Sequence, residues 1–350
     1  MRQVRLAAFG GPEVLEIQEV EVPAPPAEGY LVELRAIGVN FAEIVERRGR
    51  YRREQQLPAV LGKEAAGVIV DRGPGARDFE LGETVIVVSF AGGCYADYFA
   101  ASPHQLLRGP ASYGFEELAA FANSFATAWY ALVEQMRARR GEAILITAAA
   151  GALGSAAVAL ARALGLEPVI GLAGSGAKCR FVEERLGAHA CFETAGDQLG
   201  TRIRSLTAGR GIDLVLDSVG GSVLDLALEL LAPLGRLVSV GFSSIDRDYR
   251  GALPTLHLLE LFHRSISVSG LNLENLDYPR RQSAWRELVS FVECHGLRPV
   301  VGEIFPLHHV AAAHQALESR ATFGKLILRP GVRPAAGARA PFELTAQPPE

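Results

Sequence analysis

The sequence predicts an α/β fold in which a doubly wound parallel sheet is joined to a β-rich domain. Residues 143–161 read as a buried strand that passes through a glycine turn directly into a helix of small residues. Strand-like and helix-like segments then alternate about five times up to residue 271, which is typical of a parallel sheet covered on both faces. Short β-branched runs bounded by Gly and Pro fill most of residues 1–110 and predict the β-rich part.

The alternating half is predicted element by element from its periodicity. Apolar, β-branched runs predict strands at 143–148, 168–172, 189–193, 212–217, 235–241 and 266–271. The segments between them predict helices at 153–164, 177–186, 197–207, 222–232 and 254–263.

Outside this half, the patterns predict strands at 29–40, 64–70, 82–88 and 324–329 and helices at 115–139, 280–295 and 309–318. The closing strand suggests that the C-terminal part folds back onto the N-terminal domain. We therefore expect a β-rich domain at 1–124, a nucleotide-binding domain at 125–271 and a C-terminal return at 272–330. Residues 331–350, rich in Pro and Ala, are expected to form a disordered tail.

The composition is that of a soluble globular enzyme, with 49% hydrophobic and 21% charged residues. The net charge of -4 argues against nucleic acid as a partner. The uncharged run at 143–161 is interrupted by glycines and hydroxyl groups, so we expect no membrane span. The start of the chain lacks a signal-peptide core, and the four cysteines form no C-x-x-C pair. Isolated thiols are typical of the reducing cytoplasm, where we expect the protein.

The glycine turn predicts a site for a dinucleotide pyrophosphate. The N–H groups at the start of a helix attract anions, so Gly151, Ala152, Leu153 and Gly154 are candidate pyrophosphate ligands. We expect Gly151 to form the tight turn and Gly154 to allow close packing of helix and strand. The alternative is an ordinary strand-to-helix loop, since Ala149 replaces the first glycine of the usual pattern.

The residues after the second strand favour NADPH over NADH. About 20 positions past the glycines, where an acidic residue usually binds the ribose, the chain has no Asp or Glu. Ser175, Lys178 and Arg180 follow instead and suit a 2′-phosphate, although the two cations could simply be solvated. The ends of later strands are expected to place Val219, Gly241 and Phe242 beside the nicotinamide ribose, unless these are plain turns.

Motifs along residues 1 to about 329 resemble those of the medium-chain dehydrogenase/reductases, in the zinc-free quinone oxidoreductase and enoyl reductase branch. They are Gly38-Val-Asn40, Gly82-Glu-Thr-Val, Thr127-Ala-Trp-Tyr-Ala, Ala148-x-x-Gly151-x-x-Gly154, Leu186-Gly-Ala188, Asp217-Ser-Val-Gly-Gly and Gly324-Lys325. The resemblance implies a Rossmann sheet, a GroES-like catalytic domain and a homodimer formed through the edge strand at 266–271.

The resemblance also bears on zinc. The alcohol dehydrogenase branch has a catalytic Cys just after the Gly-Val-Asn segment and a His in a later Gly-His-Glu. This chain has Asn40-Phe-Ala-Glu and Gly62-Lys63-Glu64 instead, and it has no group of four closely spaced cysteines. A zinc site needs three or four converging ligands. We therefore expect no metal and no zinc.

The resemblance assigns candidate catalytic residues. Enoyl-thioester reductases have a Tyr proton donor eleven positions after this Asn, and Asn40 and Tyr51 keep that spacing. Asn40 would hold the nicotinamide side. Lys63 would bind an enolate oxygen or pair with Glu64. Thr127 and Lys325 would contact the cofactor.

Five arginines surround Tyr51 within seven residues: Arg47, Arg48, Arg50, Arg52 and Arg53. Arginine clusters bind phosphates, so they favour a thioester of coenzyme A or an acyl carrier as substrate. The alternative is a solvated loop with local ion pairs.

The sequence thus predicts an NADPH-dependent, zinc-free reductase that delivers hydride to the β-carbon of an α,β-unsaturated carbonyl compound. An enoyl thioester is the favoured substrate. A quinone is the alternative, although Val45 replaces a Tyr common in bacterial quinone reductases. A second alternative is an NADPH-binding protein with little catalysis.

Overall fold

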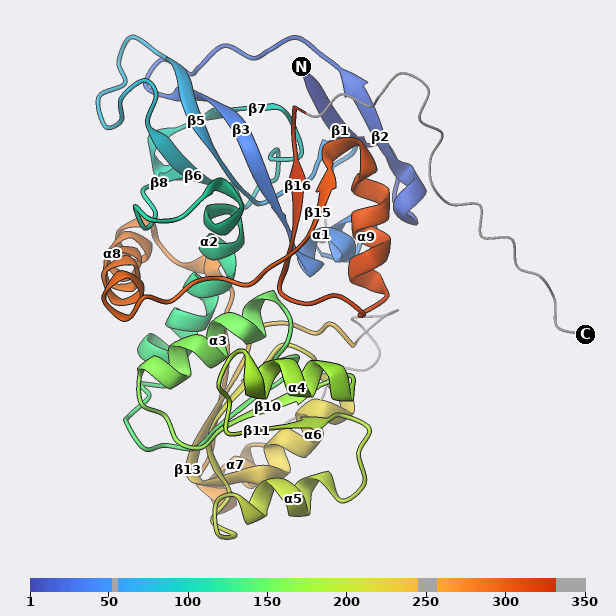
Figure 1. The fold of residues 1–350 in the computed structure, drawn as a ribbon, viewed down its shortest axis with the longest axis vertical. Coiled ribbons are helices and arrows are strands. Elements are labelled where there is room, and N and C mark those ends of the chain that lie inside the picture. The colour runs from blue at the N-terminus through green and yellow to red at the C-terminus, as the bar shows by residue number, and fades with distance from the viewer. Residues whose placement is uncertain (52–55, 245–256, 332–350) are drawn as a thin grey trace, which may run out of the picture.

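The computed structural model describes residues 1–51, 56–244 and 257–331. It has two halves, one above the other in Figure 1. The upper half holds the N-terminal strands and the last strands of the chain, and the lower half holds the alternating strands and helices. Helix α2 (Phe115–Trp129) joins them, because it packs on α3 of the lower half and on β3 and β5 of the upper half.

The lower half confirms the doubly wound parallel sheet. Its six strands are all parallel, in the order β11-β10-β9-β12-β13-β14. The strands are β9 (Ile144–Ile146), β10 (Val169–Ala173), β11 (Ala190–Glu193), β12 (Ile212–Asp217), β13 (Leu231–Ser239) and β14 (Ser267–Gly270). The helices are α3 (Ala152–Ala163), α4 (Gly176–Glu184), α5 (Leu199–Ser205), α6 (Gly221–Leu230) and α7 (Leu258–Arg264).

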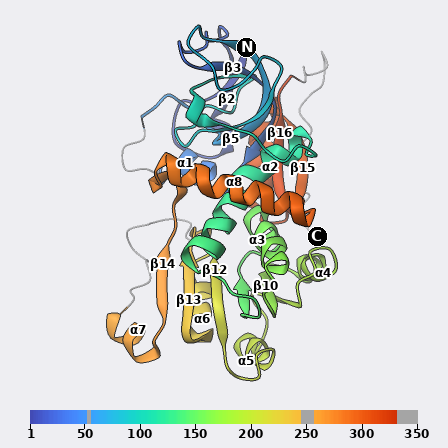
Figure 2. The same cartoon turned by 90° about the vertical axis from the view of Figure 1, so that its left-hand side faces the viewer.

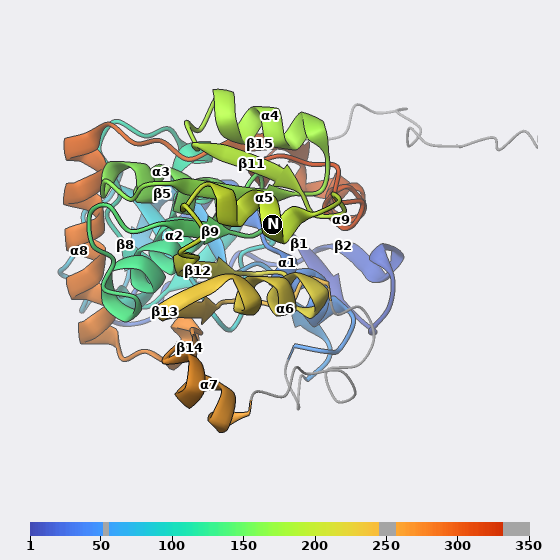
Figure 3. The same cartoon turned by 90° about the horizontal axis from the view of Figure 1, so that it is seen from below.

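Helices cover both faces of this sheet. Residues of α3 and α4 pack in one apolar core, and residues of α5 and α6 pack in another. Figure 3 shows α3 and α4 on one side of the strands and α6 on the other. The strand order reverses at β9, so the crevice at the carboxyl ends of β9 and β12 is where such a sheet binds its ligand.

Several predicted elements differ in extent. The helix expected at 222–232 ends at residue 230, and β13 begins at residue 231 instead of 235. Pro233 explains the early end, because proline disfavours helical backbone at the residue before it and cannot donate a helical hydrogen bond. The helix expected at 115–139 is shorter than predicted, because α2 ends at residue 129. A π-helical segment, η3 (Tyr130–Gln135), follows it. Of the helix expected at 254–263, residues 254–256 lie outside the described part.

The upper half has two sheets. A mixed sheet has the order β15-β16-β3-β5-β6-β8, with β7 paired to β3, and a small sheet has the order β2-β1-β4. The strands are β1 (Arg2–Leu6), β2 (Leu15–Glu19), β3 (Tyr30–Val39), β4 (Ala59–Val60), β5 (Glu64–Arg72), β6 (Thr84–Val88), β7 (Tyr98–Ala101), β8 (Leu106–Leu107), β15 (Val301–Pro306) and β16 (Lys325–Arg329). Strand β16 pairs with β3, so the C-terminal part does fold back. Strand β15 was missed from the sequence.

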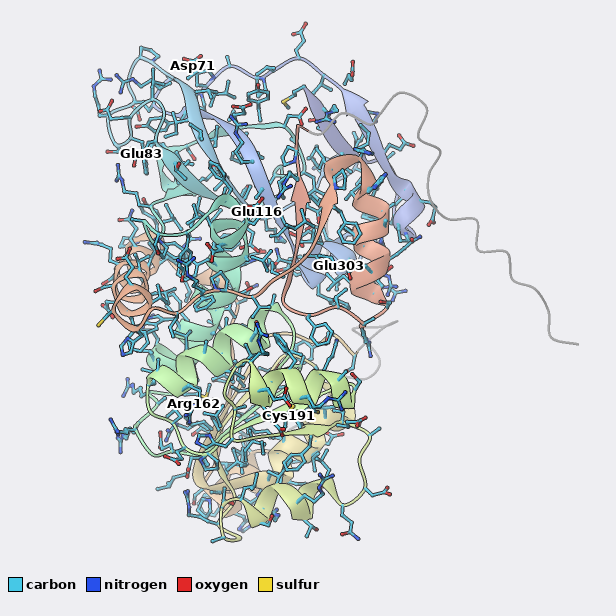
Figure 4. The ribbon with its side chains drawn as sticks, in the orientation of Figure 1. Asp71, Glu83, Glu116, Arg162, Cys191 and Glu303 are labelled. Atoms are coloured by element: carbon cyan, nitrogen blue, oxygen red, sulfur yellow. The ribbon has the colours of Figure 1, made fainter. Side chains whose placement is uncertain are left out.

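The remaining helices join the halves or cover the sheets. They are α1 (Phe41–Arg47), α8 (Tyr278–His295), α9 (Val310–Glu318) and the 3-10 turns η1 (Pro12–Val14), η2 (Pro103–Gln105), η4 (Leu273–Asn275) and η5 (Leu307–His309). Helix α8 crosses the junction of the halves in Figure 2 and packs on α2. In Figure 4, Arg162 and Cys191 lie in the lower half and Asp71, Glu83, Glu116 and Glu303 in the upper half.

The cysteines agree with the expectation of isolated thiols. All four cysteines are free, and only Cys294 is exposed. Within the three described ranges, no helix has the length and apolar character needed to cross a membrane. The predicted tail at 331–350 lies outside the described residues except for Gly331.

Candidate active site

The glycine turn follows β9 at the carboxyl edge of the parallel sheet and leads into α3. Gly154 packs as expected, because a Cβ there would lie 2.2 Å from the carbonyl oxygen of Ala148. Gly151 differs from expectation, since its φ of -80° is open to any residue. The left-handed residue of this turn is Ala148, with φ of 48°. The C-terminal segment reaches the turn, because the Gly324 N–H donates to the Ala150 carbonyl at 2.9 Å.

Of the other cofactor candidates, Val219 follows β12 and Gly241 and Phe242 follow β13, at the same edge of the sheet. The Thr147 hydroxyl and two turn N–H groups donate to the buried Asp217 carboxylate, which shapes the turn that carries Val219. The Ser244 hydroxyl donates to the Val219 carbonyl at 2.6 Å. This bond joins the turn after β12 to the segment containing Gly241 and Phe242. Half-buried Thr127 lies in the last turn of α2.

The residues proposed for a 2′-phosphate lie at the start of α4. Ser175 caps this helix by accepting the Lys178 backbone N–H at 3.4 Å. The Lys178 ammonium donates to the Arg320 carbonyl at 2.6 Å and lies 5.6 Å from the Phe323 ring centre. Arg180 is exposed. An ammonium has three N–H donors, so Lys178 keeps hydrogen-bonding capacity for an anion.

A buried ionic cluster lies where β3, β5 and β16 pair. Asn40 follows β3, Glu64 begins β5 and Lys325 begins β16, so strand pairing brings them together. The Lys325 ammonium donates to Asn40 Oδ1 at 2.6 Å and pairs with Glu64. The other Glu64 oxygen accepts the Asn123 backbone N–H at 2.7 Å. In this structure Lys325 is therefore a buried support for Asn40, and its contact with the cofactor stays a prediction.

Glu43 holds Asn40 from the other side. Its carboxylate accepts the backbone N–H of Asn40 at 2.6 Å and that of Lys63 at 3.0 Å. The sequence analysis missed it, although Asn40-Phe-Ala-Glu43 has the spacing of a capping box at a helix start. Burial raises the pKa of Glu43 to about 7, because the charged form is poorly solvated, and the nearby Lys325 and Lys63 only partly oppose this.

We expect Glu43→Gln to change how stability depends on pH. A carboxyl whose pKa rises from 4.5 to about 7 on folding stabilises the fold fully below 4.5. That contribution is lost as the pH rises through 7, by about 3 kcal/mol at 1.36 kcal/mol per unit. Urea unfolding at several pH values measures it as the wild-type minus variant free energy of unfolding. A difference that stays constant between these pH values would show that folding does not change the pKa of Glu43.

The candidate catalytic residues Tyr51 and Lys63 meet at a third residue, Glu274 of η4. The Tyr51 hydroxyl donates to Glu274 Oε1 at 3.0 Å, and the Lys63 ammonium lies 3.1 Å from the same oxygen. The ammonium also donates to the Phe90 carbonyl at 3.0 Å and lies 3.5 Å from Glu46 Oε2. Burial, and then the charge of Glu274, raise the pKa of Tyr51, which keeps it a neutral donor. No sequence signal pointed to Glu274, which lies 223 positions after Tyr51.

A mainly apolar pocket lies between α2 and α8, beside this cluster. Its wall includes the aromatic rings of Phe90, Trp129, Tyr130, Tyr278 and Trp285. The pocket borders the cluster at Leu273, the neighbour of Glu274, and at Phe90, whose carbonyl accepts from Lys63. An apolar, aromatic-lined pocket with few polar groups suits a flat organic molecule.

Arg47 was wrongly predicted to bind a substrate phosphate. Its side chain is 0% exposed, and the guanidinium donates to the Gly10 carbonyl at 3.1 Å and pairs with Glu318 at 2.5 Å. It also lies 3.3 Å from Nδ1 of buried His314. Arg47 therefore joins α1 to α9. Its guanidinium is buried between these helices and is not accessible to a substrate.

The other described arginines of the cluster differ in their surroundings. Arg48 also pairs with Glu318, at 2.8 Å, and Arg50 is exposed. Arg52 and Arg53 lie outside the described residues. The cluster is therefore not a single phosphate-binding surface.

Comparisons with known proteins place these features in a family. Residues 26–135 match the model of the alcohol dehydrogenase GroES-like domain, and residues 152–293 match that of the zinc-binding dehydrogenase. Human quinone oxidoreductase is 32% identical over 330 residues, covering 94% of this chain and 97% of that protein. Quinone oxidoreductase of Pseudomonas aeruginosa is 32% identical over 332 residues, covering 94% and 99%. The structure of Escherichia coli quinone oxidoreductase complexed with NADPH is similar at a TM-score of 0.84 and 30% identity, covering 94% and 100%.

The doubly wound sheet, its glycine turn and the GroES-like half define an NAD(P)H-dependent oxidoreductase. The chain belongs to the medium-chain dehydrogenase/reductase superfamily, in its quinone oxidoreductase branch. One matched model is named for zinc binding, but the described residues contain no group of three or more His, Cys, Asp or Glu that could hold a metal ion.

Proposed function

We propose that this protein is an NADPH-dependent reductase of conjugated carbonyl compounds, with a quinone or a free enone as substrate. The observation that carries the proposal is the meeting of two donors, Tyr51 and Lys63, on one oxygen beside an aromatic-lined pocket. These donors suit a carbonyl oxygen that becomes negatively charged on reduction. The quinone oxidoreductase names of the relatives support this choice of substrate.

The cofactor residues fit NADPH. The first turn of α3 leaves backbone N–H groups without acceptors in the helix, and the absence of a side chain at Gly154 keeps α3 close to its strand. We assign the pyrophosphate to Gly151, Ala152, Leu153 and Gly154 and the 2′-phosphate to the start of α4. Val219, Gly241, Phe242 and Thr127 would border the nicotinamide half. When bound, NADPH supplies a hydride.

The protein residues then have separate roles in reduction. Addition of hydride to carbon moves an electron pair onto the carbonyl oxygen, which Lys63 and Tyr51 hold by charge and hydrogen bond. With an enone, a proton from water or from Tyr51 then adds to the α-carbon and gives the saturated ketone. With a quinone, such a proton adds to the charged oxygen, and transfer of the ring C–H proton to the second oxygen gives the hydroquinone. Asn40, held by Glu43 and Lys325, would orient the nicotinamide side of the site.

Steady-state kinetics with NADPH test the proposal, with a soluble quinone, a free enone and crotonyl-coenzyme A as substrates. We expect the quinone or enone to be turned over with the higher kcat/KM. An enoyl thioester is the second candidate, favoured by exposed Arg50 beside Tyr51. Turnover of the thioester alone would replace our proposal with that candidate. Cofactor binding without consumption of NADPH would instead indicate a binding protein.

Lys178→Ala is expected to weaken NADPH binding about tenfold and to leave NADH binding unchanged, because a charge-assisted bond to the 2′-phosphate is lost. Fluorescence titration of the reduced cofactors gives both dissociation constants. Arg180→Ala is the matched variant. A larger loss with Arg180→Ala would assign the phosphate to Arg180, and equal losses for NADPH and NADH would reject this phosphate site.

Domain boundaries and assembly are also proposals. We assign cofactor binding to residues 125–271 and catalysis to residues 1–124 together with 272–330, supported by the pairing of β16 with β3. We propose a homodimer through edge strand β14 and helix α7, where Leu258 and Phe262 are 83% and 76% exposed. Light scattering should give the mass of two chains. The zinc-free state and the cytoplasmic location stay predictions.

A further inference from the structure

Two hydrogen-bond donors from different elements converge on a single oxygen of Glu274. Tyr51 follows α1 and reaches Oε1 at 3.0 Å, and Lys63 precedes β5 and reaches it at 3.1 Å. The Lys63 side chain is 2% exposed, so its charge needs an anionic partner in the protein or in a ligand. Two donors at this distance from one point form the arrangement that binds an oxyanion.

We infer that Glu274 is an internal ligand that occupies the oxygen-binding site of Tyr51 and Lys63, and that the substrate oxygen must displace its carboxylate. This inference rests on the proposed function. The carboxylate oxygen stands for the charged oxygen of the reduced substrate, since it has the same charge and accepts the same two bonds.

The surroundings allow the Glu274 side chain to leave while its backbone stays. Its backbone N–H donates to Asn272 Oδ1 at 3.0 Å, and neighbouring Leu273 is buried in the pocket wall, so the turn η4 is anchored. The Glu274 side chain is 21% exposed, in contrast to Lys63. We therefore assign the exchange to the Glu274 side chain and not to the main chain of η4. Glu46 remains 3.5 Å from the ammonium to balance part of its charge.

The position of the pocket connects this exchange to substrate binding. Leu273 and Phe90 line the pocket, and they adjoin Glu274 and Lys63 respectively. A flat molecule in the pocket would thus have its oxygen edge next to the two donors. Glu274 then lowers the affinity for every ligand that uses this site, because part of each ligand's binding energy is spent on displacing it.

Binding of 4-nitrophenolate tests the inference without turnover. This phenolate is an oxyanion on a flat ring, and its own absorbance reports binding to the NADP⁺-loaded protein at a pH where the free ligand is ionised. We expect Glu274→Ala to bind it roughly tenfold more tightly than wild type, because competition from a charged hydrogen-bond acceptor is removed. Glu274→Gln keeps an acceptor oxygen without the charge, so its affinity should lie between the two. Exposed Glu287 on α8 provides the control Glu287→Ala, which should match wild type.

The outcomes separate this inference from the proposed function. Weaker or unchanged phenolate binding in Glu274→Ala overturns the inference and makes Glu274 a positioning residue for Tyr51 and Lys63. Absence of phenolate binding in all variants also overturns it, because the donors then form no oxyanion site. Tighter binding in folded Glu274→Ala or Glu274→Gln supports it, even if no variant consumes NADPH with quinone or enone. In that case only the proposed function fails.

Discussion

Lys63→Met is expected to lower kcat/KM by about a hundred- to a thousandfold, the usual cost of losing one donor to a developing oxyanion. Methionine has nearly the length of lysine but no charge and no N–H donor. The ammonium of Lys63 lies within hydrogen-bond distance of the oxygen that we assign to the substrate position. The substrate oxygen would keep only Tyr51. Steady-state kinetics with NADPH and the preferred substrate measure the loss.

Two measurements exclude a trivial cause. Titration of NADPH fluorescence should show unchanged cofactor affinity, because Lys63 lies outside the proposed cofactor residues. A cooperative thermal unfolding transition should show a folded protein, since methionine fills nearly the same space as the lysine side chain. Full activity in a folded Lys63→Met protein would remove Lys63 from the reaction.

Arg47→Met is expected to destabilise the fold by about 3 kcal/mol, because breaking a buried ion pair leaves polar groups without their partner. The guanidinium of Arg47 joins the Gly10 carbonyl, Glu318 and His314. Burial and the adjacent guanidinium lower the pKa of His314 to about 3, so this histidine is neutral and does not repel the charge of Arg47. Urea unfolding at neutral pH measures the change.

The neighbouring arginine supplies a matched control. Arg48 pairs with the same Glu318 oxygen, but its side chain is 34% exposed, so Arg48→Met should cost less than about 1 kcal/mol. Equal losses for the two variants would contradict a special role for the buried network. A loss of activity in Arg47→Met beyond its loss of folded protein would reopen the question of a substrate contact.

Lysine usage contains a signal that the sequence analysis did not use. The chain has 35 basic residues, and only Lys63, Lys178 and Lys325 are lysines. All three lie at the candidate site, two of them buried. Lysine differs from arginine in its compact charge and its freely rotating donors. Because lysine is rare in this chain, each lysine could have been chosen as a candidate site residue. That choice would have included Lys325 in the ionic cluster and would have supported the role assigned to Lys63.

The sequence analysis missed two carboxylates of the site, and only one of them lies in a recognisable local pattern. Glu43 lies three positions after Asn40, so a local capping pattern could have found it. Glu274 had no such pattern, because its partners Tyr51 and Lys63 lie far away in the chain and only the placement of η4 brings them together. The five arginines near Tyr51 led to a wrong expectation for Arg47, although all of them lie close together in the chain. A run of like charges usually indicates a solvated surface, yet the helical turn of α1 points Arg47 inward.

The sequence by itself determined the alternating half, the glycine turn, the closing strand and the family resemblance. These depend on periodicity and on single residues such as Gly154, whose effects act within a few positions of the chain. Only the tertiary structure decided that Arg47 is a structural residue, that Lys325 supports Asn40 and that Glu274 meets Tyr51 and Lys63. Each of these contacts joins segments more than 200 positions apart. Local patterns contain no information on such distances, so packing alone decides which charged side chains share a buried site.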